Sequence, residues 1–111
     1  MTLHWLLGYK IKEGRAEAFV AYLKSKSFKR LRGQLLRETG IKIIATYFTV
    51  EPSSSEIHDY DAWDLWEVPN YAAIDRYVAS KARDRFIRSY LIPYVGSSYK
   101  WITVQKQDFA E

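Results

Sequence analysis

Hydrophobic and polar positions alternate along residues 3–12. One side of the pattern holds Leu3, Trp5, Leu7, Tyr9 and Ile11, and the other holds His4, Leu6, Gly8 and Lys10. A period of two residues with many aromatic and aliphatic side chains is typical of a β-strand. We therefore expect a strand here, which ends at Glu13-Gly14.

The pattern then changes to the spacing of a helix. Apolar residues recur at Ala16, Phe19, Val20 and Leu23, and after a polar interruption they resume at Phe28, Leu31 and Leu35. This spacing places the apolar side chains on one helix face. It predicts one long helix, or two pieces that meet near Ser27, a residue type that caps helix N-termini. Gly40 is the expected end of this region.

Three further strands are predicted in the rest of the chain. Residues 41–50 and 59–68 are rich in β-branched and aromatic side chains, and the polar stretch 51–56 separates them as a loop. Residues 99–105 form the last predicted strand. Between the third and the last strand, Asn70 is the expected N-cap of a second helix, whose apolar stripe continues to Leu91.

The predicted order of elements is β-α-β-β-α-β over residues 1–111, a length that fits one domain. This order predicts an α+β domain of the ferredoxin-like class. Such a domain has a four-stranded antiparallel sheet with both helices on one face.

The strand residues predict that the second face of this sheet is covered as well. A sheet face that meets water is normally polar. Here, strict alternation along residues 41–50 places Ile41, Ile43, Ala45 and Tyr47 on one side and Ile44, Phe48 and Val50 on the other. We therefore expect a homodimer through the sheet faces, which would bury about 800 Å² per subunit.

The run from Asp64 to Ile74, DLWEVPNYAAI, together with the element order, resembles the dimeric α+β barrel superfamily, in particular its antibiotic-biosynthesis monooxygenase-like and NIPSNAP-like branches. The resemblance implies a dimer with a pocket between the sheet and the helices of each subunit. It also implies a cofactor-free monooxygenase or isomerase activity. Many monooxygenase-like members carry a His on the following helix, whereas the comparable residue here is Tyr77, at a longer spacing.

Composition excludes several classes of site. The chain has no cysteine and two histidines, His4 and His58, which excludes disulfides, thiolate catalysis and a three-His metal centre. Gly-rich phosphate loops, serine-hydrolase elbows and zinc or calcium motifs are absent from the sequence. We expect no metal and no cofactor.

Residue counts also indicate whether the chain spans a membrane and what kind of organism it comes from. No segment approaches the roughly 18 apolar residues that span a membrane, and the first residues lack the basic region of a signal peptide. A cytoplasmic location is the resulting expectation. One Met and one Asn make thermolabile residues scarce, which reflects either a thermophilic source or chance in a short chain.

Charge is unevenly distributed along the chain, whose net charge is +4. Residues 10–38 hold nine basic and three acidic groups, whereas residues 51–75 hold seven acidic groups and no Lys or Arg. RNA-recognition modules share the predicted topology, but their basic-Gly-aromatic strand motif is absent and the corresponding strand is acidic. The sequence therefore disfavours a nucleic-acid partner.

Two ionisable residues are candidates for proton transfer. Asp64 shares a strand face with Trp66, and if that face meets the helices its carboxyl needs an inward Arg or Tyr as partner. His4 is a candidate general base, with a structural histidine as the alternative. The other carboxylates of this segment, Asp59, Asp61 and Glu67, lie on the opposite strand face from Asp64 and fit a hydrated edge or a hard-cation site.

Four aromatic residues, Tyr9, Tyr47, Trp66 and Tyr77, are candidates for the wall of a small-molecule pocket, with core packing as the alternative. Three functions remain open at this point. The chain is a cofactor-free enzyme for a small aromatic or enolisable molecule, a non-catalytic ligand-binding or regulatory module, or a structural dimer. An enzyme needs a sequestered titratable group beside the aromatic wall, whereas a binding module needs only shape and hydrogen bonds.

Overall fold

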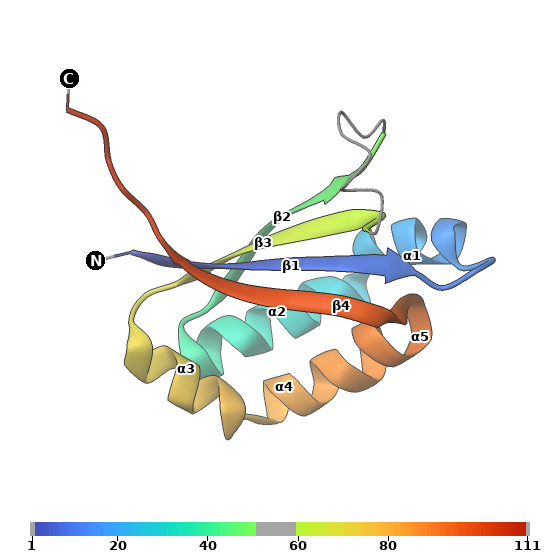
Figure 1. The fold of residues 1–111 in the computed structure, drawn as a ribbon. Helices are drawn as coiled ribbons and strands as arrows, with labels where there is room; N and C mark the ends of the chain where they lie inside the picture. The colour runs from blue at the N-terminus through green and yellow to red at the C-terminus, as the bar shows by residue number, and fades with distance from the viewer. Residues whose placement is uncertain (1, 51–59, 111) are drawn as a thin grey trace.

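A layer of helices lies against one face of a four-stranded sheet in the computed structural model, which describes residues 2–50 and 60–110 (Figure 1). The elements are β1 (Leu3–Ile11), α1 (Ala16–Leu23), α2 (Lys26–Thr39), β2 (Lys42–Phe48), β3 (Ala62–Val68), α3 (Tyr71–Val78), α4 (Lys81–Phe86), the π-helical turn η1 (Ile87–Leu91), α5 (Ile92–Tyr94) and β4 (Val95–Gln105). The strand order is β2-β3-β1-β4, and all neighbours are antiparallel. The predicted ferredoxin-like α+β fold is confirmed.

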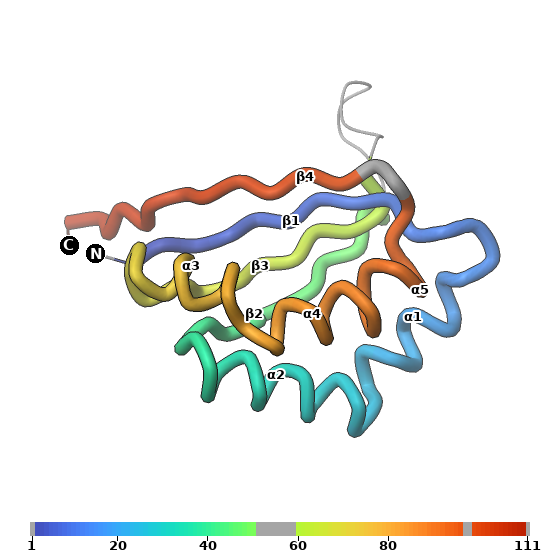
Figure 2. The backbone as a smooth tube through the Cα atoms, turned by 90° about the horizontal axis from the view of Figure 1, so that it is seen from below, coloured from blue at the N-terminus to red at the C-terminus, as the bar shows by residue number. Residues whose placement is uncertain are grey.

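The helical regions are divided more finely than their apolar stripes predict. Ser25, rather than Ser27, begins α2, because its hydroxyl accepts a hydrogen bond from the backbone N–H of Phe28. Asn70 begins α3 as predicted, and its side chain accepts from the N–H of Ala73. Ser80 then caps a new helix, α4. Figure 2 shows α3 and α4 following one another in one row, with α2 alongside this row.

An irregularity in β2 changes which side chains face the helices. The register of β2 against β3 shifts between Ile43 and Ala45. Beyond this β-bulge, Thr46 faces inward and Tyr47 faces the helix-free side, the reverse of what strict alternation predicts. Strict alternation puts Phe48 on the face opposite Ile43, but the bulge brings it to the helix side, where the centroid of its ring lies 6.2 Å from that of Phe19 on α1.

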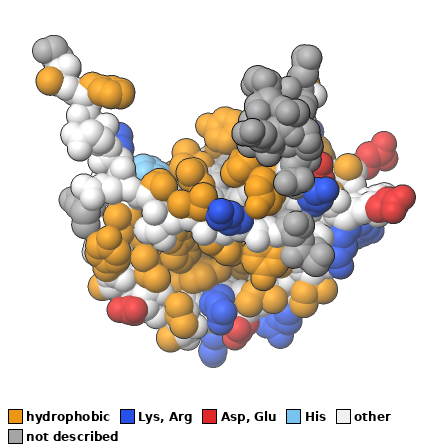
Figure 3. Space-filling model, viewed as in Figure 1, with side chains coloured by type: hydrophobic (Ala, Val, Ile, Leu, Met, Phe, Trp, Pro, Cys, Tyr) orange, Lys and Arg blue, Asp and Glu red, His pale blue; other side chains and the backbone are white. Residues whose placement is uncertain are grey.

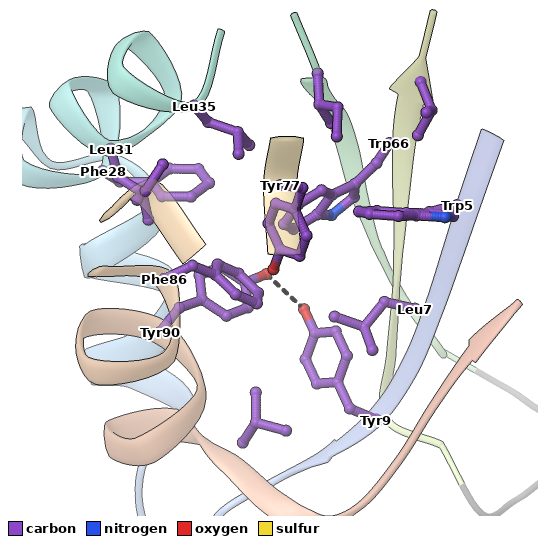
Figure 4. Close-up of a cluster of buried hydrophobic side chains, with 14 of the residues drawn as sticks. Trp5, Leu7, Tyr9, Phe28, Leu31, Leu35, Trp66, Tyr77, Phe86 and Tyr90 are labelled. Atoms are coloured by element: carbon purple, nitrogen blue, oxygen red, sulfur yellow. Dashed lines mark hydrogen bonds between the residues drawn. The ribbon is translucent and has the colours of Figure 1, made fainter. Parts of the chain in front are cut away.

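Aromatic rings fill the space between the sheet and the helices. Trp5, Leu7, Tyr9 and Trp66 project from the strands toward Phe28, Leu31, Leu35, Tyr77, Phe86 and Tyr90 on the helices (Figure 4). Phe86 stacks on Tyr90 with a centroid separation of 4.6 Å and meets the edge of Trp66 at 4.9 Å. This core holds the two sites described below in fixed positions.

The helix-free face of the sheet carries an apolar patch, although His4, Glu67 and Lys42 lie on the same face. Leu6 pairs with Leu65 on one side and with Ile102 on the other, and all three are at least partly exposed. Trp63 lies across the neighbouring position, Gly8. Within the described part of the chain, no helix has the length and apolar character needed to cross a membrane.

Candidate functional site

A cavity of about 420 Å³ opens between β4 and the helices α3, α4 and η1. Figure 3 shows hydrophobic side chains gathered on the side of the molecule that carries β4. The wall is built from both layers, with Trp5, Trp101 and Thr103 from the strands and Tyr77, Arg83 and Ile87 from the helices. This volume falls within the range of small-molecule pockets.

Ring contacts and one hydrogen bond fix the aromatic wall. The ring of Trp5 meets that of Tyr77 edge-on at 5.0 Å and that of Trp101 at 5.3 Å. The indole N–H of Trp5 donates to Thr103 Oγ1 at 3.0 Å. Trp66 is fully buried behind the wall, and the centroid of its ring lies 5.1 Å from that of Trp101. The rings around this cavity are therefore preorganised rather than loosely placed.

Two polar groups face this apolar surface. Arg83 is the one charged residue among the lining residues that the structure describes. Burial raises the pKa of the Tyr77 hydroxyl, and the positive charge of Arg83 offsets part of this rise. Tyr77 therefore stays protonated at neutral pH and is available as a hydrogen-bond donor. A phenol and a guanidinium on one wall suit a carbonyl or anionic oxygen.

A second polar cluster lies deeper in the core, around Asp64, whose exposed fraction is 1%. Oδ1 accepts hydrogen bonds from the hydroxyls of Tyr9 (2.7 Å) and Thr46 (2.9 Å). Oδ2 lies 2.6 Å from the Tyr90 hydroxyl and 3.4 Å from the indole nitrogen of Trp66. Asp64 thus has the inward Tyr partner that its position on the strand requires.

The electrostatics of this cluster follow from burial. Burial raises the pKa of Asp64, and the hydrogen bonds that Tyr90, Tyr9 and Thr46 can donate to the ionised carboxylate offset part of the rise. Burial also raises the pKa of both phenols, and the neighbouring Asp64 carboxyl adds to the effect. Burial therefore shifts all three groups toward their neutral forms.

The other predicted site residues lie elsewhere. His4 is on the helix-free face, where it pairs with Glu67 and Val104, so the sheet separates it from Asp64. Tyr47 is on the same helix-free face and is 59% exposed. Of the four predicted wall residues, Tyr77 alone lines the cavity. Tyr9 belongs to the Asp64 cluster and Trp66 connects the cluster to the wall.

The remaining ionisable candidates do not assemble a metal site in the described residues. Asp61 accepts a hydrogen bond from the backbone N–H of Ile11 at 2.8 Å. His58 and Asp59 lie outside the described residues. Across residues 2–50 and 60–110, no three His, Asp or Glu side chains gather closely enough to hold a metal ion.

Sequence reasoning did not select several residues of these two sites, among them Arg83, Trp101, Thr46 and Tyr90. The sequence pattern places Arg83 on a basic helix and Trp101 in the last strand but gives neither a place in a cavity wall, and strict alternation misplaces Thr46 because the bulge interrupts it. Tyr90 was assigned only to the apolar stripe. The alternation of Tyr99, Trp101 and Thr103 on one side of β4 is the signal that could have identified the cavity wall.

No family model and no curated protein matches the sequence. Solved structures do match. One is a DABB family protein with a ferredoxin-like fold from Mesorhizobium loti, with a TM-score of 0.65, 14% identity and coverage of 96% of this chain and 98% of that one. The chain has the ferredoxin-like fold of this protein.

Two further matches come from the branches that the sequence resembles. A protein from Bacteroides thetaiotaomicron, described provisionally as an antibiotic biosynthesis monooxygenase, has a TM-score of 0.60, 18% identity and coverage of 95% of this chain and 89% of that one. A NIPSNAP family protein of unknown function from Agrobacterium tumefaciens has a TM-score of 0.65, 10% identity and coverage of 98% and 91%. The predicted resemblance is thereby confirmed at the level of the fold.

Proposed function

We propose that this ferredoxin-like protein binds a small, planar aromatic or enolisable molecule in the cavity beside β4. The observation that carries the proposal is the combination of an aromatic wall, Trp5, Tyr77 and Trp101, with one guanidinium, that of Arg83. Flat rings pack on such a wall, and Arg83 pairs with a carboxylate or an enolate oxygen. The cavity volume suits a molecule of one or two rings.

We propose further that the protein works as a homodimer through the helix-free face of its sheet. Leu6, Leu65 and Ile102 form an apolar patch there that a second copy would bury. A structural neighbour from Bacteroides fragilis is described as a dimeric protein of unknown function with a ferredoxin-like fold. A two-fold pair would leave the cavities accessible, since they lie on the helix side of the sheet.

A cofactor-free enzymatic activity is the second candidate, and the state of Tyr77 favours it. A protonated phenol beside a guanidinium can donate to a substrate carbonyl and stabilise the enolate that forms when solvent water or hydroxide takes the proton from the adjacent carbon. The proposal assigns these roles to Tyr77 and Arg83 rather than to Asp64 and His4. Asp64 is buried behind Trp66, and His4 faces the other side of the sheet.

Tryptophan fluorescence tests the proposal directly, because Trp5 and Trp101 form the wall. We expect saturable quenching by planar aromatic carboxylates such as benzoate, salicylate and 2-naphthoate, and weaker quenching by their methyl esters. Arg83→Gln removes a charged hydrogen bond of about 1.5–3 kcal/mol, so affinity should fall roughly tenfold or more. Arg88→Gln, an exposed cation on η1, is the matched control.

The two candidate functions separate in a second variant. Tyr77→Phe keeps the ring and removes the donor. If the protein is an enzyme, this variant should retain ligand binding and lose turnover of an enolisable substrate, measured as solvent deuterium incorporation. If no carboxylate quenches the fluorescence, or if the Arg83 and Arg88 variants are quenched equally, the hypothesis that the cavity is the binding site is wrong.

A further inference from the structure

The oxygens of Asp64, Tyr9 and Tyr90 make three short contacts with one another, one more than two phenol hydrogens and an ionised carboxylate can account for. Three oxygen–oxygen contacts form a closed triangle: Tyr9 to Asp64 at 2.7 Å, Tyr90 to Asp64 at 2.6 Å, and Tyr9 to Tyr90 at 2.9 Å. The dashed line in Figure 4 marks the contact between the two phenols. Each contact of this length requires a hydrogen atom between its oxygens.

Counting hydrogens decides the protonation state. The two phenols supply two hydrogens to the three contacts, and an ionised carboxylate supplies none. The hydroxyl of Thr46 and the indole N–H of Trp66 are directed to the Asp64 oxygens, so they cannot supply the third. A proton on Asp64 supplies it. Asp64 Oδ2 then donates to Tyr90, Tyr90 donates to Tyr9, and Tyr9 donates to Asp64 Oδ1.

We propose that Asp64 is a neutral carboxylic acid at neutral pH and closes a ring of hydrogen bonds with Tyr9 and Tyr90, and that this ring is a pH-sensitive lock on the wall of the cavity. The first part stands on the contacts alone. The second part rests on the ligand-binding function proposed above.

The surroundings of the ring favour the neutral acid. Every packed element presents an uncharged group: Tyr9 from β1, Thr46 from β2, Trp66 from β3, Phe19 and Tyr22 from α1, Phe28 from α2, Phe86 from α4 and Tyr90 from η1. The titratable groups among these are the three tyrosines. Among the described residues, no Lys, Arg or His forms an ion pair or a hydrogen bond with Asp64. An unpaired charge in such a place is costly.

The ring is coupled to the cavity through η1. Tyr90 lies on this π-helical turn between Ile87 and Leu91, and both of these line the cavity. When Asp64 loses its proton, both phenols donate to the carboxylate, and their oxygens face each other at 2.9 Å with no hydrogen between them. This repulsion displaces Tyr90, and η1 moves with it. Ligand affinity should therefore fall as pH rises through the ionisation of Asp64.

Isotope-edited infrared spectroscopy tests the protonation state. Protein labelled with ¹³C in the aspartate carboxyls should show, at neutral pH, a protonated-carboxyl carbonyl band that shifts in D₂O. Asp64→Asn should remove this band, while Asp61→Asn, which removes an exposed carboxylate, should retain it. If the folded wild-type protein shows carboxylate bands alone at neutral pH, the neutral ring is wrong.

Amide NMR tests the coupling without any ligand. The backbone N–H signals of Ile87–Leu91 should move at the same pH at which the infrared band disappears, and should not move in folded Asp64→Asn. Movement that is equal in both proteins, or absent in the wild type while the band is lost, would overturn the lock. These readouts are independent of the fluorescence titration, so failure of the ring and failure of the ligand site remain distinguishable.

Discussion

Gly8 lies beneath the indole ring of Trp63 on the helix-free face of the sheet. A Cβ atom at position 8 would come 2.8 Å from Trp63 Cζ3, closer than any stable contact allows. Glycine in the middle of a strand normally weakens it, and its presence here is explained by this close approach.

Gly8→Ala should therefore destabilise the protein. The Trp63 ring must move, and such overpacking costs about 1–3 kcal/mol. Urea unfolding at fixed protein concentration measures the change. Gly96→Ala is the control, because its Cβ would meet Lys10 O at an ordinary 3.5 Å. Equal stability of the two variants would mean that Trp63 relaxes without cost.

Ser25→Ala should lower the free energy of unfolding by about 1 kcal/mol, because it removes the N-cap of α2. Ser27→Ala, two residues along in the first turn, should change it by no more than about 0.5 kcal/mol. Thermal unfolding of both variants compares the two serines. A larger effect at Ser27 would place the start of α2 where the sequence alone puts it.

Asp64→Asn should change how stability depends on pH. The folded-state pKa of Asp64 is raised by burial above the unfolded value of about 3.9. The stabilisation from a raised carboxyl is fully present below the unfolded pKa and is lost as pH rises through the folded pKa. The wild type should therefore lose stability relative to Asp64→Asn as pH increases from about 4. Urea unfolding across a pH series, with Asp61→Asn as control, measures this. A wild-type advantage that grows with pH would indicate an ionised Asp64.

Ile102→Lys should weaken the proposed dimer. The change places a charge within the apolar patch, beside Leu6, and burying an unpaired charge in an interface costs several kcal/mol. Light scattering after size-exclusion chromatography measures the mass at several concentrations. Ile92→Lys is the control, since Ile92 is 59% exposed on the helix side. A monomeric wild-type protein, or a dimer unaffected by Ile102→Lys, would reject this interface.

The sequence predicts those features that depend on local periodicity. Alternation from Leu3 to Ile11 identifies β1, and Asn70 marks the start of α3. It also places Asp64 on the same strand face as Trp66, and this holds in the structure because no irregularity interrupts the pairing of β3 with β1. These features follow from side-chain direction along one element.

What the sequence does not predict depends on single-residue irregularities and on contacts between distant elements. The bulge after Ile43 moves Thr46 and Tyr47 each to the face opposite the one that strict alternation predicts. No residue type in β2 indicates that a bulge occurs there. The cavity is lined by Arg83 and by Trp101, 18 residues later in the chain, so neither stretch of sequence predicts it alone. Ser25 and Ser27 are the same residue type, and backbone conformation decides which one caps the helix.

The bulge in β2 also affects how readily the protein aggregates through the edge of its sheet. Because β2 is an edge strand, its outer backbone groups could recruit strands from other molecules and start fibril growth. A strand that paired in register with Lys42-Ile43 would be out of register at Thr46, and the exposed charge of Lys42 adds repulsion. The irregularity that turns Thr46 inward thus also guards the chain against edge-to-edge aggregation.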